Sequence, residues 1–158
     1  MPKTVSDLMT RDVVVIRSNL DVHELEQVFL AKGIHGAPVV DANARLVGVV
    51  SQTDLLTWHY ESGRDGGGFY DPPDLRGEPL RGLHMADIRT APVAEVMTPL
   101  VHAVRPDDTL AEAANRMIRH RIHRLVVVDE QLHVLGILSA MDLLRLIPGV
   151  STPAGRGG

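Results

Sequence analysis

The sequence predicts an α/β (α+β) fold in which two tandem β-α-β-β-α repeats pack sheet-to-sheet with pseudo-two-fold symmetry. The first observation behind this prediction is an internal repeat, because a shift of 88 positions aligns residues 5–56 with residues 93–144 without a gap. Sixteen of these 52 aligned positions are identical, whereas random pairing gives roughly one in fifteen at ordinary composition. The chain therefore carries a duplicated unit, and one unit is too small to bury both faces of its sheet alone.

The second observation is the composition of the apolar residues. The 158-residue chain has only five aromatic residues, and four of them lie between positions 58 and 70. The core elsewhere must consist of Val, Leu, Ile, Met and Ala, which suits strands that are covered by helices.

The third observation is that both copies contain the same order of local patterns: a lead-in helix, a strand, a longer helix, two strands and a last helix. A cap residue followed three positions later by an acidic residue opens the helices, and a glycine ends the longer helix of the first copy. In the first copy the elements are expected after Thr4, at 13–16, from Asp21 to Gly33, at 37–40, at 46–50 and after Ser51. In the second copy they are expected from Thr90, after Thr109, at 125–128, at 134–138 and after Ser139.

The same patterns divide the chain into four parts. Four of the six residues at 63–68 are glycine, and Asp-Pro-Pro-Asp at 71–74 is incompatible with regular structure. We expect repeat 1 at 1–57, a Gly/Pro-rich linker or flap at 58–89, repeat 2 at 90–147 and a disordered tail at 148–158.

Charge and composition argue against several classes of protein. The formal net charge of −4 gives no general attraction for nucleic acid. Arginine and histidine gather between positions 116 and 124, and this local patch favours one small anion. The chain has no cysteine, no apolar signal region and no apolar run of membrane-spanning length. We expect a soluble cytoplasmic protein without nucleic-acid or membrane partners.

Motifs for catalysis or metal binding are weak. His120 and His123 have the spacing for a shared ion and His133 follows them, but no third ligand stands at a motif spacing. There is no Gly-x-Ser-x-Gly nucleophile elbow, and the glycines at 66–68 are not followed by the Lys-Ser/Thr of a phosphate-binding loop. We expect no metal site and no enzymatic activity, and an enzyme acting through the histidines is the alternative.

Three stretches recur in both copies: Met-Thr at 9–10 and 97–98, the stretches 38–41 and 126–129, and Gly-x-x-Ser-x-x-Asp-Leu at 48–55 and 136–143. In these stretches each copy resembles the CBS domain, and the two copies together resemble a stand-alone tandem CBS-domain pair. The resemblance implies a regulatory sensor that requires no cofactor and binds AMP, ADP, ATP or S-adenosylmethionine in clefts between the repeats. It also implies a homodimer and an unknown regulated protein as partners. The alternative is a dimerisation or scaffold module with vestigial, empty clefts.

The resemblance assigns the ribose contacts to Asp54 and Asp142, and each of them follows a serine by three positions. An ionised carboxylate can accept from both ribose hydroxyls, and each charge-assisted bond is worth roughly 1.5–3 kcal/mol. Ser51, Ser139 and Thr53 stand beside these aspartates and are expected to support the same contacts. The alternative is that the Ser-x-x-Asp spacing only caps a helix.

The base pocket is expected to combine residues from both copies. The resemblance implies that Asp142 acts with Thr10 and Val13, and that Asp54 acts with Thr98 and Val101. An adenine base needs an apolar slot with a few polar partners, and Ala37 belongs to the same expected pocket. The alternative for these residues is a helix end and a core strand.

The resemblance also implies phosphate contacts from His35, His123 and Arg124. A guanidinium can offer a bidentate fork to a phosphate. The first copy has Gly36 where the second has Arg124. We therefore expect unequal clefts, with the one near Arg124 better suited to an anionic ligand. Gly36 and Met141, which replaces a threonine of the first copy, favour the alternative of empty clefts. For His123 and Arg124 the alternative is a solvated surface.

Overall fold

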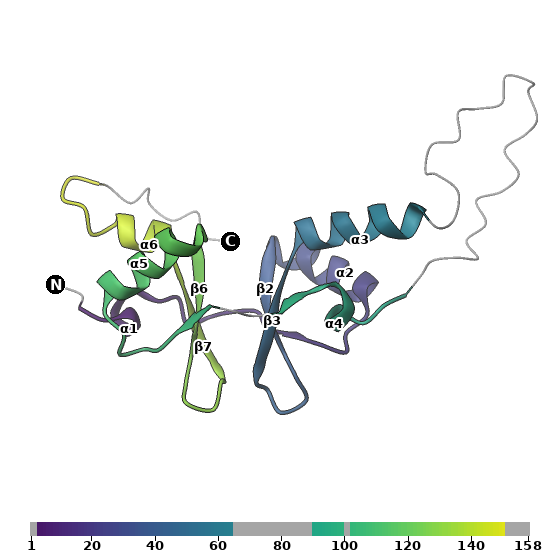
Figure 1. Cartoon of the computed structure of the whole chain (residues 1–158), viewed down its shortest axis with the longest axis horizontal. Coiled ribbons are helices and arrows are strands. Elements are labelled where there is room, and N and C mark those ends of the chain that lie inside the picture. Colours follow the sequence, from purple (N-terminus) through teal and green to yellow (C-terminus); the bar gives the residue numbers. More distant parts are fainter. Residues whose placement is uncertain (1–2, 65–89, 100–101, 151–158) are drawn as a thin grey trace, which may run out of the picture.

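The computed structural model describes residues 3–64, 90–99 and 102–150, which form two α/β halves side by side (Figure 1). The first repeat contains α1 (Val5–Leu8), β1 (Ile16–Arg17), α2 (Val22–Lys32), β2 (Gly36–Val40), β3 (Leu46–Ser51) and α3 (Gln52–Arg64). The second repeat contains α4 (Val93–Val96), β4 (Thr98–Pro99), β5 (Ala103–Val104), α5 (Leu110–His120), β6 (Arg124–Val128), β7 (Val134–Ser139) and α6 (Ala140–Leu144). The predicted fold class is confirmed.

Each half is built on one small sheet. β1 pairs with β2 in parallel and β2 pairs with β3 antiparallel, and β5, β6 and β7 repeat this arrangement. The helices α2 and α5 supply the crossovers that parallel strands require, whereas short turns join the antiparallel pairs. In Figure 1 the strands β2, β3, β6 and β7 lie toward the middle of the molecule, and the helices α2, α3, α5 and α6 lie outside them.

The lead-in segments are exchanged between the two repeats. β4 extends the sheet of the first repeat by pairing with β3, where Thr98 is the partner of Val49. In the same way, Thr10 forms a bridge with Ile137 of β7, with an N–H···O distance of 2.9 Å in each direction. Val5 of α1 is buried in the core of the second repeat. Each half in space therefore consists of the body of one repeat and the lead-in of the other.

Two glycines permit this close exchange. A Cβ atom on Gly136 would lie 2.6 Å from the Thr10 carbonyl oxygen and 3.0 Å from the Met9 sulfur. A Cβ atom on Gly48 would meet Thr98 and Met97 in the same way, at 2.6 and 2.7 Å. Only a residue without a side chain lets the lead-in backbone approach the strand at these points.

The helix caps follow the sequence pattern closely. The Asp21 carboxylate accepts the backbone N–H of His23 at 2.9 Å at the start of α2, and the Thr109 hydroxyl accepts that of Glu112 at 3.2 Å at the start of α5. Gly33 ends α2 with φ of 62°, a conformation that costs glycine little. These local signals depend on neighbouring residues alone, and so the sequence predicts them correctly.

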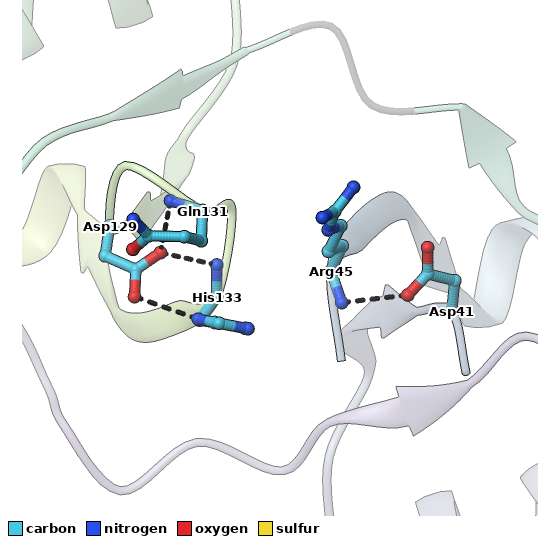
Figure 2. Close-up of polar contacts among 5 residues, drawn as sticks. All are labelled: Asp41, Arg45, Asp129, Gln131 and His133. Carbon is cyan, nitrogen blue, oxygen red and sulfur yellow. Dashed lines mark hydrogen bonds and ion pairs between the residues drawn. The ribbon is translucent and has the colours of Figure 1, made fainter. Parts of the chain in front are cut away.

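The two hairpin turns meet where the repeats face each other (Figure 2). The Leu46 N–H donates to the Leu132 carbonyl at 2.8 Å, and Leu46 packs with Val126 and Val128 in a small core shared by both repeats. The Asp129 carboxylate closes its turn by accepting the backbone N–H of His133 at 2.8 Å. Burial would raise the pKa of Asp129, but its hydrogen bonds from the turn outweigh burial and lower it. The expected sheet-to-sheet packing thus includes a direct contact between the turns.

Three element boundaries differ from the sequence prediction. Residues 58–64, which the pattern assigns to the linker, continue α3. Trp58 packs against the hydrophobic core of the first repeat, and His59 is hydrogen bonded to Glu26 of α2. β1 begins at Ile16, so that most of the expected strand 13–16 is irregular and borders a cleft instead. The cap of α4 is Pro92 and not Thr90.

Parts of the expected linker and tail lie outside the described residues. This applies to 65–89, which include most of the glycine-rich flap, and to 151–158. Of the expected disordered tail, residues 148–150 form a turn in which the Val150 N–H donates to the Ile147 carbonyl at 3.2 Å. None of the helices among the described residues has the length and apolar character needed to cross a bilayer.

Candidate ligand-binding clefts

Two clefts of similar size lie between the repeats, at positions that the 88-residue shift relates to each other. We name them after the aspartate in each. The Asp142 cleft has a volume of about 350 Å³ and is lined by Thr10, Asp12, Val13, Val14, Gly33, Ile34, His35, Gly36, Arg124, Ile137, Ser139 and Asp142. The Asp54 cleft has a volume of about 340 Å³ and is lined by His35, Gly36, Ala37, Pro38, Val49, Val50, Ser51, Asp54, Thr98, Arg124, Val126 and Ile137. Both volumes fall within the range of small-molecule sites.

The two aspartates do cap their helices. One oxygen of Asp142 accepts both the backbone N–H and the hydroxyl of Ser139, each at 2.8 Å. Asp54 accepts the same two groups of Ser51, at 2.7 and 2.9 Å. The capping interpretation is therefore realised in both repeats. It accounts for Oδ2 of each carboxylate and leaves Oδ1 for other partners.

The second oxygens of the two carboxylates have other partners within the protein. Oδ1 of Asp54 accepts the hydroxyl of Thr98 at 3.3 Å, and Oδ1 of Asp142 forms an ion pair with Arg145 at 3.4 Å. Asp142 has only 6% of its surface exposed, and its ion pair with Arg145 and its hydrogen bonds from Ser139 account for a buried carboxylate. A ligand hydroxyl could share either oxygen, because each carboxylate oxygen has two lone pairs. The ribose contact itself stays a prediction.

Each cleft combines both repeats, in the grouping that the resemblance implies. Thr10 and Val13 line the Asp142 cleft, and Thr98 lines the Asp54 cleft together with Ala37. The exchange of lead-ins explains this grouping, because it places each Met-Thr segment on the sheet of the other repeat. Val101 lies outside the described residues.

The residues expected to bind phosphate do not all lie where the sequence analysis places them. Arg124 borders both clefts and not one, and so do His35 and Gly36, because they start the central strands where the two repeats meet. His123 is exposed and lines neither cleft, and its backbone carbonyl accepts the Ala140 N–H at 2.8 Å. A difference between the clefts therefore cannot arise from Arg124 alone.

Thr53 and Met141 also lie away from the clefts. Both are exposed and neither lines a cleft. They occupy the helix position just before the capping aspartate, and a step of one residue turns a side chain by about 100° around the helix axis. Thr53 therefore does not place its hydroxyl in the cleft where the ribose is expected. Met141, which stands at the equivalent position of the second copy, does not change the polarity of the other cleft.

Several lining residues are missing from the sequence-based expectation. Val49 and Ile137 follow Gly48 and Gly136 and pair with the exchanged threonines. Asp12 lies between Thr10 and Val13 and adds a second carboxylate to the Asp142 cleft. The duplicated glycines are a usable signal for Val49 and Ile137, whereas Asp12 has no counterpart in the second copy, where position 100 is Leu.

The histidines do not form a metal site within the described part of the chain, where no group of three or more His, Cys, Asp or Glu side chains could hold an ion. His120 stacks on His102 with ring centroids 3.8 Å apart. Burial, followed by repulsion from His102, Arg119 and Arg116, lowers the pKa of His120. The pair of His120 and His123 suggested by spacing is therefore replaced by a stacked pair of His120 and His102.

The fold and the clefts define a tandem α/β repeat module with a pair of pseudo-equivalent inter-repeat clefts. A family model described as CBS domain matches residues 5–61 and 93–149. The chain belongs to the CBS-domain family, whose members are typically regulatory and non-catalytic modules.

Comparisons with individual proteins agree with this assignment. The chain is 31% identical over 152 residues to the uncharacterised protein MJ1426 of Methanocaldococcus jannaschii, covering 90% of each chain. It is 30% identical to the 5'-AMP-activated protein kinase subunit gamma-3 of Sus scrofa, of which it spans only 27%. The crystal structure of CBSX2 in complex with AMP superposes with a TM-score of 0.67 at 29% identity, covering 91% of this chain and 95% of that one.

Proposed function

We propose that the protein is a cytoplasmic sensor module that binds an adenosine-containing ligand in its inter-repeat clefts and transmits occupancy to a partner protein. The observation that carries the proposal is the pair of clefts of about 350 and 340 Å³, each with a capping aspartate from one repeat and a threonine from the other. The related CBSX2, which has the same overall arrangement, binds AMP. AMP, ADP, ATP and S-adenosylmethionine are the candidate ligands. No cofactor and no catalytic step are part of the proposal.

The exchanged lead-ins give the proposal its physical mechanism. A ligand in the Asp142 cleft contacts Thr10 of one repeat and Asp142 of the other, and thus bridges the two repeats. Such a ligand favours the relative orientation in which both contacts are made. This difference in affinity between orientations is the only source of a signal that a partner protein can read.

Calorimetric titration with the four candidate ligands tests the proposal. We expect binding that Asp142→Ala and Asp54→Ala each weaken at one site by tenfold or more, which corresponds to about 1.4 kcal/mol. Thr109→Ala is the matched control, because it removes the cap of a helix at a residue that lines neither cleft. If no ligand at millimolar concentration produces heat or a thermal shift, the proposal is wrong. If Thr109→Ala weakens binding as much as Asp142→Ala does, the aspartate acts only through the stability of the fold.

A second candidate function, a dimerisation or scaffold module, is favoured by exposed apolar side chains on the outer helices. Leu30 of α2 and Ile118 of α5 occupy equivalent positions and each is 76% exposed. Leu56 of α3 and Leu144 of α6 are a second pair of exposed residues at equivalent positions. Leu30 and Leu56 line one common surface pocket, and contiguous apolar surface of this kind marks sites of association. We propose that these helices join two copies in a homodimer, with or without ligand.

Light scattering after size-exclusion chromatography tests the homodimer. The wild-type chain should elute as a dimer, and Leu30→Glu combined with Ile118→Glu should shift it to a monomer. Gln27→Glu is the control, since it adds a charge at another exposed position of α2. A monomeric wild type would refute the homodimer but would leave ligand binding to be judged by calorimetry.

A further inference from the structure

The two clefts differ in charge at one position that the repeat does not share. Asp12 is exposed and lines the Asp142 cleft but not the Asp54 cleft. Among the described residues, the Asp142 cleft is lined by two carboxylates and one guanidinium, whereas the Asp54 cleft is lined by one carboxylate and one guanidinium. His35 is common to both linings, and Arg145, outside the lining, pairs with Asp142, so that Asp12 is the carboxylate that distinguishes the Asp142 cleft.

The single guanidinium cannot compensate both clefts at once. Arg124 borders both of them, and Gly36 supplies no side chain at the matching position. Within the described residues, Arg124 makes no hydrogen bond or ion pair with another side chain, so its donors are available to a ligand. A phosphate bound by Arg124 in one cleft removes that donor from the other cleft.

We infer that Asp12 determines the ligand class of each cleft. The carboxylate disfavours phosphate in the Asp142 cleft, which takes an adenosyl ligand without phosphate charge, and a nucleotide binds in the Asp54 cleft with Arg124. The physical reason is that like charges repel and opposite charges attract at the short distances within a cleft of about 350 Å³, even where the charged group is exposed. The inference rests on the proposed function, because it requires that both clefts accept adenosyl groups.

Asp12 differs from Asp142 in its charged neighbours. No described cation forms an ion pair with it, whereas Asp142 has Arg145 at 3.4 Å. Asp12 is exposed and lies outside the regular elements, so that Asp12→Asn changes charge at nearly constant shape. This makes it a suitable position for separating charge from packing.

The test measures the affinities of ATP and of neutral 5'-methylthioadenosine for each cleft separately. Asp54→Asn weakens ligand binding in the Asp54 cleft, so that the measured affinity is that of the Asp142 cleft. Asp142→Asn weakens binding in the Asp142 cleft, so that the measured affinity is that of the Asp54 cleft. In the Asp54→Asn background, Asp12→Asn should raise the affinity for ATP about tenfold and change that for 5'-methylthioadenosine less than twofold. In the Asp142→Asn background, the same substitution should change neither affinity by more than twofold.

Two further variants complete the experiment. Arg124→Ala in the Asp142→Asn background should weaken ATP by tenfold or more and leave 5'-methylthioadenosine nearly unchanged. Asp107→Asn removes an equal charge from an exposed residue that lines neither cleft and should have no effect. The inference is wrong if Asp12→Asn leaves ATP affinity unchanged, or if it strengthens both ligands equally. Absence of binding by either ligand to the wild-type chain would instead overturn the proposed function, and the inference with it.

Discussion

Gly136→Ala tests whether the exchanged lead-in holds the repeats together. The new Cβ atom would lie 2.6 Å from the Thr10 carbonyl oxygen, while ordinary contacts begin near 3.4 Å, so that the carbonyl must move by about 0.8 Å. This movement strains the two reciprocal hydrogen bonds between Thr10 and Ile137, each 2.9 Å long. Their loss costs about 0.5–1.5 kcal/mol each, and overpacking costs about 1–3 kcal/mol.

The expected loss of folding free energy is therefore about 2–6 kcal/mol. For a chain of this size, about 1 kcal/mol shifts Tm by 2–4 °C, so circular dichroism should show a decrease of about 4 °C or more. Calorimetry should also show weaker binding in the Asp142 cleft, because Thr10 lines it. Gly36→Ala is a control for stability alone, since its nearest contact, the Val50 carbonyl oxygen, is at 3.2 Å and Gly36 lines both clefts. An unchanged Tm and unchanged binding in Gly136→Ala would refute the packing of the lead-in against β7.

Two other predictions concern stability. Thr109→Ala removes the side-chain cap of α5 and should cost about 1 kcal/mol, seen as a decrease of about 2–4 °C in Tm, whereas Thr109→Ser should retain wild-type stability. Thr109→Ala should also raise the pKa of Glu112, because hydrogen bonds from the Thr109 side chain and backbone lower that pKa. His120, whose pKa is lowered chiefly by burial, binds fewer protons in the folded state than in the unfolded state, so stability should fall as the pH drops through about 6.5. Chemical denaturation at pH 7.5 and 5.5 should show a smaller decrease for His120→Asn than for the wild type, and equal decreases would contradict the assignment.

The sequence predicts those features that depend on nearby residues. Asp21, Thr109 and Gly33 act on groups within a few positions of themselves, and the structure has them as caps and as a helix end. The duplication predicts two similar sheets for the same reason, because each copy repeats the local patterns. The final turns of α3 are not predicted from the sequence. They depend on contacts with other elements, namely the packing of Trp58 on the core of the first repeat and the hydrogen bond of His59 with Glu26 of α2.

Features that depend on which repeat a segment contacts are not readable from the pattern. An alignment of two copies is the same whether each lead-in packs on its own repeat or on the other. Gly48 and Gly136 indicate a close approach at both strands, but they do not identify the approaching segment. The resemblance to CBS domains supplied that grouping, and the structure gives its reason in the backbone pairs of Thr10 and Thr98.

The exchange also explains how two small clefts could control the whole molecule. Each cleft is closed by a lead-in that belongs, along the chain, to the opposite repeat, and the hairpin turns add a contact between Leu46 and Leu132. A change in the relative orientation of the repeats must therefore alter both clefts together. Under the proposed function, ligand in either cleft biases the same movement, and an anion bound by Arg124, which borders both clefts, should reduce the affinity of the other cleft for anions. Coupling of this kind is reciprocal, so each ligand should weaken or strengthen the other by the same factor.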